Sequence, residues 1–309
     1  MSLKVIDPGF WTTVQDVGRA GYREWGVPKG GAFDRGSAEL ANALLGNGPG
    51  AAVLELTLRG GTFEARESLG MALAGAPIEA AVRSPDGHLR SPRSPSSFSI
   101  RASDRLVLGR ITQGARAYLA VKHGFETPST LGSRSAEEPL RKGDILPAES
   151  STHPSRFLAE PVWSDPAARA VRIIAGPDAS FLDDPDFWRR GTFRVGSRSN
   201  RMGLRLEGPP LAIESDPDRL SAPVAPGAIQ VAGGQLIVLG VACGTIGGYP
   251  HVAHVISADL DRLGQLRPGD IVHFEPVRLS AARDLDRSRR HAHRSLIARV
   301  SSLARDVYA

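Results

Sequence analysis

The sequence reads Val53-Leu54-Glu55-Leu56-Thr57-Leu58 in a stretch that alternates apolar and polar residues. Side chains point to opposite faces along an extended chain, so the three leucines share one face, while Glu55 and Thr57 share the other. This pattern is typical of a β-strand with one face in a hydrophobic core. Because similar runs recur along the chain, the protein is predicted to be mainly β.

Further short apolar runs lie on both sides of this stretch. They are Leu69–Ala74, Arg105–Leu108, Ala117–Val121, Ala170–Ala175, Gly203–Glu207, Ile229–Val231, Leu236–Val241 and Ile271–Phe274. The 34 Gly and 23 Pro favour many turns between short strands. Arg141-Lys142-Gly143-Asp144 and Arg267-Pro268-Gly269-Asp270 each precede an apolar strand. These equivalent turns indicate two related β domains.

Few helices are expected. Asp34 can cap a helix that runs to Leu45, and Asp259–Leu266 is expected to be a short helix or turn. In the tail, Leu296, Val300, Leu303 and Val307 have helical spacing, which predicts one amphipathic helix. The predicted organisation is a first β domain over 1–150, a linker over 151–168, a second β domain over 169–280 and a basic helical tail over 281–309.

Composition limits the classes of function. The net charge is +5, but residues 281–309 carry seven Arg against three Asp, so the rest is nearly neutral. We therefore expect neither nucleic-acid nor membrane binding, and expect the tail helix to pack on its own domain. The single cysteine allows no internal disulfide. No signal peptide or spanning helix is evident, so a cytoplasmic location is expected.

Several standard motifs are missing from the sequence. It contains no phosphate-binding P-loop, no dinucleotide fingerprint and no Gly-x-Ser-x-Gly elbow. His251 and His254 are three residues apart in a strand-like run, so their rings are expected on opposite faces. No metal site is predicted. Cys243 has no nearby His in the sequence, and it is expected to be a buried small hydrophobic residue.

A series of segments in a fixed order carries a family resemblance. The segments are Thr12–Tyr22, Gly26–Arg35, Leu40–Asn47, Leu54–Thr57, Ala117–Val121, Leu131–Ser135, Ser199–Gly208, Pro226–Val231, Gly247–Pro250, Val255–Leu260 and Arg267–Asp270. Together they resemble one family with several names: allophanate hydrolase subunit 2, the A subunit of biotin-dependent carboxyltransferase, and the C subunit of 5-oxoprolinase (KipA-like). The resemblance covers residues 3 to about 277.

The resemblance implies two cyclophilin-like β-barrel domains with few short helices. It also implies a partner, a B-subunit homologue (allophanate hydrolase subunit 1, KipI-like). In 5-oxoprolinase a third protein, the A-subunit protein (LamB/YcsF-like), completes the ATP-dependent opening of pyroglutamate to glutamate. In urea carboxylase the similar region transfers a carboxyl group from carboxybiotin to urea. No cofactor is expected on this chain itself: ATP would act in the assembled complex, and biotin would be on a separate carrier.

Chemistry at a planar amide needs a group that polarises the carbonyl and a group that handles a proton. Arg19, Arg35, Arg134 and Arg201 lie in the matched segments and offer planar donors. Arg201 is a candidate catalytic residue, and the other three are candidate substrate-binding residues. Each of the four can instead pair with an acid, such as Asp16 or Asp34, and hold a loop in place.

Glu55 is the candidate proton acceptor, because burial in general raises the pKa of a carboxyl group. The alternative is an ion pair with an arginine. Gly247 and Gly248 allow close approach of backbone to a ligand, and Tyr249 can stack on a small ring. Gln230 can both donate to and accept from a cyclic amide, or it can satisfy a buried backbone group.

Two stretches depart from the pattern of the oxoprolinase branch. Where that branch usually carries an acidic residue, one spacer and a Gln, this chain has Ala242-Cys243-Gly244. A long glycine-rich loop is replaced by the short segment 136–140. Three functions remain: a component of a 5-oxoprolinase, a non-catalytic regulatory binder of the B-subunit homologue, or the carboxyltransferase component of a urea carboxylase-like system.

Overall fold

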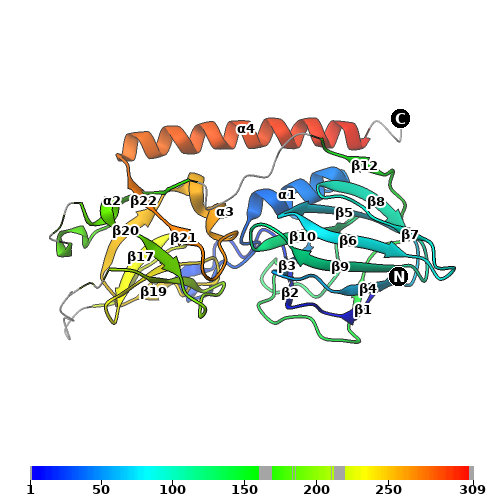
Figure 1. Cartoon of the computed structure of the whole chain (residues 1–309), viewed down its shortest axis with the longest axis horizontal. Helices are drawn as coiled ribbons and strands as arrows, with labels where there is room; N and C mark the ends of the chain where they lie inside the picture. The colour runs from blue at the N-terminus through cyan, green and yellow to red at the C-terminus, as the bar shows by residue number, and fades with distance from the viewer. Residues whose placement is uncertain are drawn as a thin grey trace. The chain divides into compact units, whose positions relative to one another are not determined.

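The computed structural model describes residues 2–159, 169–182, 184, 186–209, 211 and 220–305 (Figure 1). Contacts divide the chain into two units. Unit 1 comprises Met1–Arg19, Gly30–Ser164 and His293–Ala309, and unit 2 comprises Ala20–Lys29 and Asp165–Ala292. Half of the predicted linker, residues 160–168, lies outside the described residues.

Unit 1 contains two six-stranded sheets, antiparallel throughout their pairings. The first has the order β11 (Ile145–Pro147), β1 (Ser2–Asp7), β4 (Thr62–Ala65), β9 (Arg105–Ile111), β6 (Ile78–Arg83) and β7 (Leu89–Arg90). The second has the order β12 (Arg156–Phe157), β8 (Ser96–Ile100), β5 (Leu69–Gly75), β10 (Arg116–Val121), β3 (Val53–Thr57) and β2 (Trp11–Gln15).

Strand β3 shows how the sequence produces these layers. Leu54 and Leu56 point into the main core of unit 1, which collects apolar side chains from both sheets. Val53 points the other way, into a second cluster under helix α1 (Arg35–Leu44). The predicted alternation is confirmed from Val53 to Leu56, whereas Leu58, expected on the face of Leu54 and Leu56, lies beyond the strand with φ of 60° and is half-buried. Both faces of β3 are buried, because α1 packs on the sheet face opposite the main core (Figure 1).

Helix α1 begins where the sequence predicts. The Asp34 carboxylate accepts a hydrogen bond from Ser37 N at 3.0 Å, which satisfies one of the free amides of the first turn. The helix places Ala38, Ala41 and Leu45 over strands β5 and β10. Its cap and apolar face thus agree with the sequence.

Helix α4 (Leu279–Arg305) confirms the predicted tail helix and begins two residues earlier. In unit 1 its buried side chains are Val300 and Ala304, with Leu296 and Ile297 partly buried. Leu303, predicted on this face, is instead exposed, and Val307 lies outside the described residues. With 3.6 residues per turn, Leu303 lies at one edge of the stripe of side chains around Val300. The buried side of the helix is turned towards Ile297, on the other edge, so Leu303 is left in solvent.

Unit 2 is built on one eight-stranded sheet (Figure 1). Its order is β21 (Ile271–Val272), β14 (Phe193–Val195), β15 (Gly203–Glu207), β18 (Gln235–Leu239), β17 (Ala228–Ala232), β20 (His251–Val255), β13 (Val171–Ala175) and β22 (Phe274–Pro276). The two edge strands, β21 and β22, are separated by His273 alone. The edges must therefore lie close together, and the sheet forms a nearly closed barrel.

Short elements complete unit 2. They are η1 (Arg23–Trp25), η3 (Ala179–Phe181), α2 (Phe187–Arg190), η4 (Ser257–Asp259), α3 (Leu260–Leu263) and a two-stranded ribbon of β16 (Ala222–Pro223) and β19 (Ile246–Gly247). The predicted short helix near Asp259 corresponds to η4 and α3. The prediction of a mainly β protein with few helices and a C-terminal helix is confirmed.

The two predicted equivalent turns have the same geometry. In the first, Asp144 accepts from Arg141 N at 2.7 Å, and Gly143 has φ of 96°. In the second, Asp270 accepts from Arg267 N at 2.8 Å, and Gly269 has φ of 94°. Each glycine then donates to a strand, to Val5 O in unit 1 and to Val195 O in unit 2. The turn therefore plays the same role in both units.

Candidate functional site

The loop Ala242–Tyr249, here called the glycine loop, rests on the side chain of Gln230. Gln230 is buried on β17, and its Nε2 donates to the Tyr249 carbonyl at 3.1 Å. A Cβ added at Gly247 would lie 2.9 Å from the same nitrogen. A side chain here would displace the Gln230 amide, so glycine allows the close approach of backbone and amide. Gln230 supports the loop from beneath.

The glycine loop is held on its other side by β16. Ala222 pairs with Gly247 and Pro223 pairs with Ile246. Just beyond the ribbon, Val224 N donates to Thr245 O at 3.0 Å. The Tyr249 side chain remains 55% exposed. An exposed phenol on a supported backbone can stack on a small planar group or donate a hydrogen bond to it.

Arg23 also belongs to this region, although it was not singled out in the sequence. Its guanidinium donates to the Val224 carbonyl, while its Nη1 is buried and has no hydrogen-bond partner among the described residues. The guanidinium also lies beside the buried thiol of Cys243. Burial raises the pKa of Cys243, and Arg23 only partly opposes that. The thiol is thus neutral, in agreement with the prediction of a buried residue.

Arg201 lies where the glycine loop begins. Its side chain is buried, and its backbone carbonyl accepts from Ala242 N at 3.1 Å. The next residue, Met202, accepts from Gly240 N at 2.9 Å and has an exposed side chain. The structure thus brings Arg201, Gln230 and the glycine loop together within unit 2.

His251 and His254 correct one sequence-based expectation. Their rings lie on one face, with Nδ1 of His254 3.3 Å from Nε2 of His251. The cause is a bulge: Gln230 pairs with His251 and Ile229 with Ala253, so Val252 is an extra residue in β20. An extra residue resets the alternation of side chains. Burial first, and then His251, lower the pKa of His254 to about 4.

In unit 1, Glu55 belongs to a closed buried network. Its Oε2 accepts from Phe33 N and from the Tyr118 hydroxyl, both at 2.8 Å, and its Oε1 lies 3.3 Å from Arg116 Nε. The Arg116 guanidinium in turn lies over the Phe33 ring, 4.7 Å from the centroid. Glu55 is 1% exposed. Burial and the adjacent Glu55 raise the pKa of Tyr118 well above its usual value.

Arg19 and Arg134 both hold the loop that contains Ser133. Arg19 donates to the carbonyls of Thr130 and Ser135, at 3.2 and 2.6 Å. Arg134 donates to a carbonyl of the same loop, and its backbone nitrogen donates to Asp16 at 2.6 Å. Both side chains thus hold a loop, but through backbone carbonyls and not through the paired acid that the sequence-based alternative expects.

Arg35 is placed differently from the other arginines. It lies in the first turn of α1, half exposed, and its Nε donates to Glu39 at 2.6 Å. The other Glu39 oxygen lies 2.7 Å from Nε2 of His293 on α4. Burial raises the pKa of Glu39, but hydrogen bonds from His293 and Arg35 outweigh it and leave that pKa lowered.

The predicted site residues therefore separate into two groups. Arg201, Gln230, Gly247, Gly248 and Tyr249 belong to unit 2, where they lie at the glycine loop. The remaining four belong to unit 1 and are Arg19, Arg35, Glu55 and Arg134. The two candidate catalytic residues, Glu55 and Arg201, thus lie in different units. The predicted domain bounds, 1–150 and 169–280, already place these two residues in different domains.

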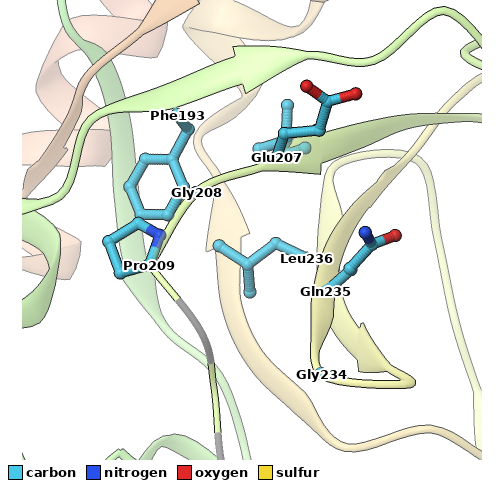
Figure 2. Close-up of a pocket in the computed structure, with 8 residues that line it drawn as sticks. Phe193, Glu207, Gly208, Pro209, Gly234, Gln235 and Leu236 are labelled. Carbon is cyan, nitrogen blue, oxygen red and sulfur yellow. The ribbon is translucent and has the colours of Figure 1, made fainter.

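Two pockets lie apart from these residues. A pocket of about 130 Å³ in unit 2 is lined by Phe193, Leu206, Glu207, Gly208, Pro209, Gly234, Gln235 and Leu236 (Figure 2). A pocket of about 590 Å³ in unit 1 is lined by Ser68, Ser84, Asp86, His88, Arg90, Ser99, Ile100, Arg101, Asp104 and Thr152. Neither contains a predicted site residue, so neither supports the predicted chemistry.

The described residues include neither a metal-binding cluster nor a membrane-spanning helix. Within them, no three or more His, Cys, Asp or Glu side chains are grouped so that they would hold a metal ion. Likewise, none of the helices in the described part is long and apolar enough to cross a membrane.

Comparison with known proteins places this geometry in a family. Residues 25–276 match the family described as carboxyltransferase domain, subdomain A and B. The chain belongs to this family. Over 298 residues it is 36% identical to the C subunit of 5-oxoprolinase from Escherichia coli, and the match covers 91% of this chain and 93% of that protein. The sequence-based resemblance is therefore confirmed.

Solved structures of carboxyltransferase-domain relatives have the same fold. The Kluyveromyces lactis urea amidolyase matches 96% of this chain with a TM-score of 0.82 and 28% identity, over 20% of its own length. The protein TTHA0988 matches 89% of this chain with a TM-score of 0.75 and 34% identity, over 56% of its own length. In both, this fold is one part of a longer polypeptide.

The two departures noted in the sequence fall at defined places of this carboxyltransferase-domain chain. Ala242 is buried at the start of the glycine loop, while Gly244 is exposed, and a Cβ there would meet only the Ile246 carbonyl, at 3.6 Å. The short segment 136–140 runs beside β2, with Ala136 N and Leu140 N donating to its carbonyls. The glycine loop is thus uncharged, and the short segment is tied to β2.

Proposed function

We propose that this chain is one component of a multi-protein enzyme that acts on a small amide or lactam. The best-supported activity is that of an ATP-dependent 5-oxoprolinase, which opens pyroglutamate to glutamate together with a B-subunit homologue and an A-subunit protein. The observation that carries this proposal is the match to the C subunit of 5-oxoprolinase, which spans nearly the full length of both chains.

The geometry supports a role within a complex. In unit 2, Tyr249 offers an exposed ring face and hydroxyl, and Gly248 beside it offers exposed backbone, to a small planar amide. Gln230 acts from beneath as a positioning residue through its bond to the Tyr249 carbonyl, and the backbone carbonyl of the buried Arg201 holds the start of the loop at Ala242. The glycine loop contains no carboxylate or imidazole for proton transfer. That group is therefore expected from elsewhere in the complex.

The start of helix α1 does not offer a site for the phosphates of ATP. Helix α1 follows Gly30 and Gly31, but the Asp34 carboxylate already occupies its first turn and accepts from Ser37. A second anion there would be repelled. We therefore assign nucleotide binding to another protein of the complex. Biotin would likewise be on a separate carrier, because these 309 residues contain no biotin-attachment segment.

Reconstitution tests the proposal. The chain is purified with its B-subunit homologue, the A-subunit protein is added, and loss of 5-oxoproline is followed with and without ATP. We expect ATP-dependent loss only when all three proteins are present. The matched control omits this chain. If the full mixture forms a complex and turns over carboxybiotin with urea instead, the 5-oxoprolinase proposal is wrong and the carboxyltransferase alternative holds.

A regulatory role is the second candidate. The observation that favours it is the uncharged sequence Ala242-Cys243-Gly244, where the oxoprolinase branch usually carries an acid and a Gln. In this case the chain would bind the B-subunit homologue without turnover. A stable complex that stays inert with the A-subunit protein, ATP and 5-oxoproline would support this candidate. Recovery of activity in the Gly244→Gln variant would strengthen it further, whereas ATP-dependent loss of 5-oxoproline with the wild-type chain would contradict it.

A further inference from the structure

The histidine pair on β20, His251 and His254, has no role in the proposed chemistry. Nδ1 of His254 lies 3.3 Å from Nε2 of His251, and both rings are half-buried. The sequence-based expectation of no metal site depends on rings that point to opposite faces of a regular strand. The bulge at Val252 removes that condition, because it brings the two ring nitrogens to the same place.

Each ring of the histidine pair also has a backbone acceptor of its own. The Pro226 carbonyl serves the His254 ring, and Ala253 serves the His251 ring. A Cβ at Gly227 would lie only 3.2 Å from Nε2 of His254, so glycine leaves room for this nitrogen beside Pro226. A neutral imidazole has one N–H, and a ring that donates it to a carbonyl keeps a lone pair on its other nitrogen.

The two nitrogens that face each other then both carry lone pairs. Hydrogen bonds from a nitrogen donor are usually about 2.7–3.2 Å long, so the separation of 3.3 Å is too long for a strong bond between the rings. Two facing lone pairs repel each other unless a cation lies between them. Imidazole nitrogens are the commonest metal ligands that side chains offer.

The spacing of the two nitrogens fits one tetrahedral ion. Bonds from zinc to histidine are about 2.0–2.1 Å long, so an ion bound to two nitrogens 3.3 Å apart would make an angle of about 107° with them. That is close to the tetrahedral angle of about 109°. A square-planar ion would need the nitrogens about 2.9 Å apart. Histidine ligands also generally donate their second nitrogen to a carbonyl or carboxylate, and both rings have such an acceptor here.

One carboxylate adds a favourable charge. Asp178 accepts from the backbone nitrogen of His251 at 2.7 Å, and its negative charge acts on the His251 ring. No third His, Cys, Asp or Glu is grouped with the two histidines within the part of the chain that the structure describes. Water would therefore fill the other positions of the ion, as it does in open zinc sites.

We propose that His251 and His254 bind one divalent transition-metal ion, with Zn²⁺ as the ion that best fits two nitrogen ligands at this angle. The site lies directly after the glycine loop. Gln230 pairs with His251 across the strands and donates to the Tyr249 carbonyl. A bound ion would thus fix β20 at the point where the chain leaves the glycine loop. The proposal goes beyond the proposed function and does not depend on it.

Titration with zinc tests the proposal. The full chain is purified without a histidine tag, stripped with EDTA and titrated with ZnCl₂ in a calorimeter, and we expect one Zn²⁺ per chain. His251→Gln and His254→Gln should each weaken the affinity more than about tenfold, since loss of a group behind a ligand already weakens metal sites about 10–100-fold. His291→Gln, at an exposed histidine of α4, is the matched control and should change the affinity by less than about threefold.

Two further measurements do not depend on the affinities of the variants. Zn²⁺ should raise the midpoint of thermal unfolding of the wild type, because a ligand that binds only the folded chain stabilises it, and should leave both glutamine variants unchanged. Co²⁺ added to the wild type in place of zinc should give the strong visible absorption of a tetrahedral site. The weak absorption of an octahedral ion would contradict the geometry inferred from the two nitrogens.

Three results would overturn the proposal. They are no binding of Zn²⁺ by the wild type, wild-type affinity in both folded glutamine variants, and loss of binding in His291→Gln alone, which would place the ion on α4. None of them bears on the proposed function, which depends on turnover of 5-oxoproline by the assembled proteins. The two can therefore fail separately.

Discussion

Glu55 in unit 1 and Gln230 in unit 2 are both polar side chains buried on a central strand, but their surroundings differ. Glu55 lies beneath α1, and its two oxygens have partners at Phe33, Tyr118 and Arg116. Gln230 lies beneath a loop whose surface is open, with Tyr249 more than half exposed above it. The first arrangement is closed to any ligand, and the second places a backbone where a ligand can reach it.

The difference teaches that burial of a polar residue has two distinct uses. A buried charge that is fully paired fixes the packing of strands and a helix, and removing one partner is costly. A buried amide that supports a glycine loop, as Gln230 does, instead fixes the position of the exposed groups on that loop. The largest effects on stability are therefore expected in unit 1, and the largest effects on activity in unit 2.

Glu55→Gln should have the largest effect on stability. It removes the charge that faces Arg116, and breaking a buried pair costs about 3–5 kcal/mol. Urea unfolding would measure the change in the free energy of unfolding. Glu64→Gln is the matched control, because Glu64 pairs with Arg105 at 2.8 Å on the surface and should cost less than about 1 kcal/mol. Normal stability together with lost turnover would instead identify Glu55 as the proton acceptor.

Acid should weaken unit 2 through His254. Its pKa of about 4 in the folded chain lies below the usual 6.5, so the unfolded chain binds the proton more tightly. The neutral His254 imidazole therefore contributes its full share of stability above pH 6.5. As the pH falls from 6.5 to 4, the free energy of unfolding should decrease by about 3 kcal/mol. Urea unfolding at pH 7, 5.5 and 4.5 would measure it.

The control for this pH dependence is a second histidine. His254→Gln should flatten the fall in stability between pH 7 and 4.5, whereas His88→Gln, on an exposed turn, should leave it as in wild type. Parallel curves for wild type and His254→Gln would contradict the burial-based explanation.

Gly247→Ala should affect activity more than stability. The new Cβ would lie 2.9 Å from Gln230 Nε2, so the amide must shift and the loop with it. We expect a loss of about 1 kcal/mol in stability and a clear fall in turnover of the assembled complex. Gly244→Ala, whose Cβ has room, is the control and should change neither. Equal turnover in both variants would remove Gly247 from the site.

Arg35→Ala should have the smallest effect. The ion pair with Glu39 is half exposed on the arginine side, and such pairs contribute less than about 1 kcal/mol. Thermal unfolding and turnover should both stay close to wild type. A tenfold fall in turnover without a change in thermal stability would show that unit 1 takes part in substrate binding through this residue.

Much of the fold could be predicted from local patterns. The alternation in β3, the Asp34 cap and the two Gly-Asp turns depend on neighbours a few residues apart, and all three are present as predicted. Leu303 shows the limit of that reasoning. Helical spacing defines a stripe, but the packing partner decides which edge of the stripe is covered.

The site could be predicted only in part. The glycine loop and Gln230 were identified, but Arg23 was not, because its contacts to Val224 and Cys243 join residues about 200 positions apart. The histidine pair was missed for a different reason. A bulge depends on the pairing of two strands, and a single strand read by itself shows only its alternation.

The matching turns allow the two units to be perturbed one at a time. Gly143 and Gly269 have the same left-handed backbone, and a Cβ at either position would meet no other atom within 4 Å. Alanine at either position would therefore impose backbone strain alone, about 1–2 kcal/mol. The two substitutions therefore impose the same strain, one on unit 1 and the other on unit 2. Comparing the thermal unfolding of the two variants would show which unit limits the thermal stability of the chain.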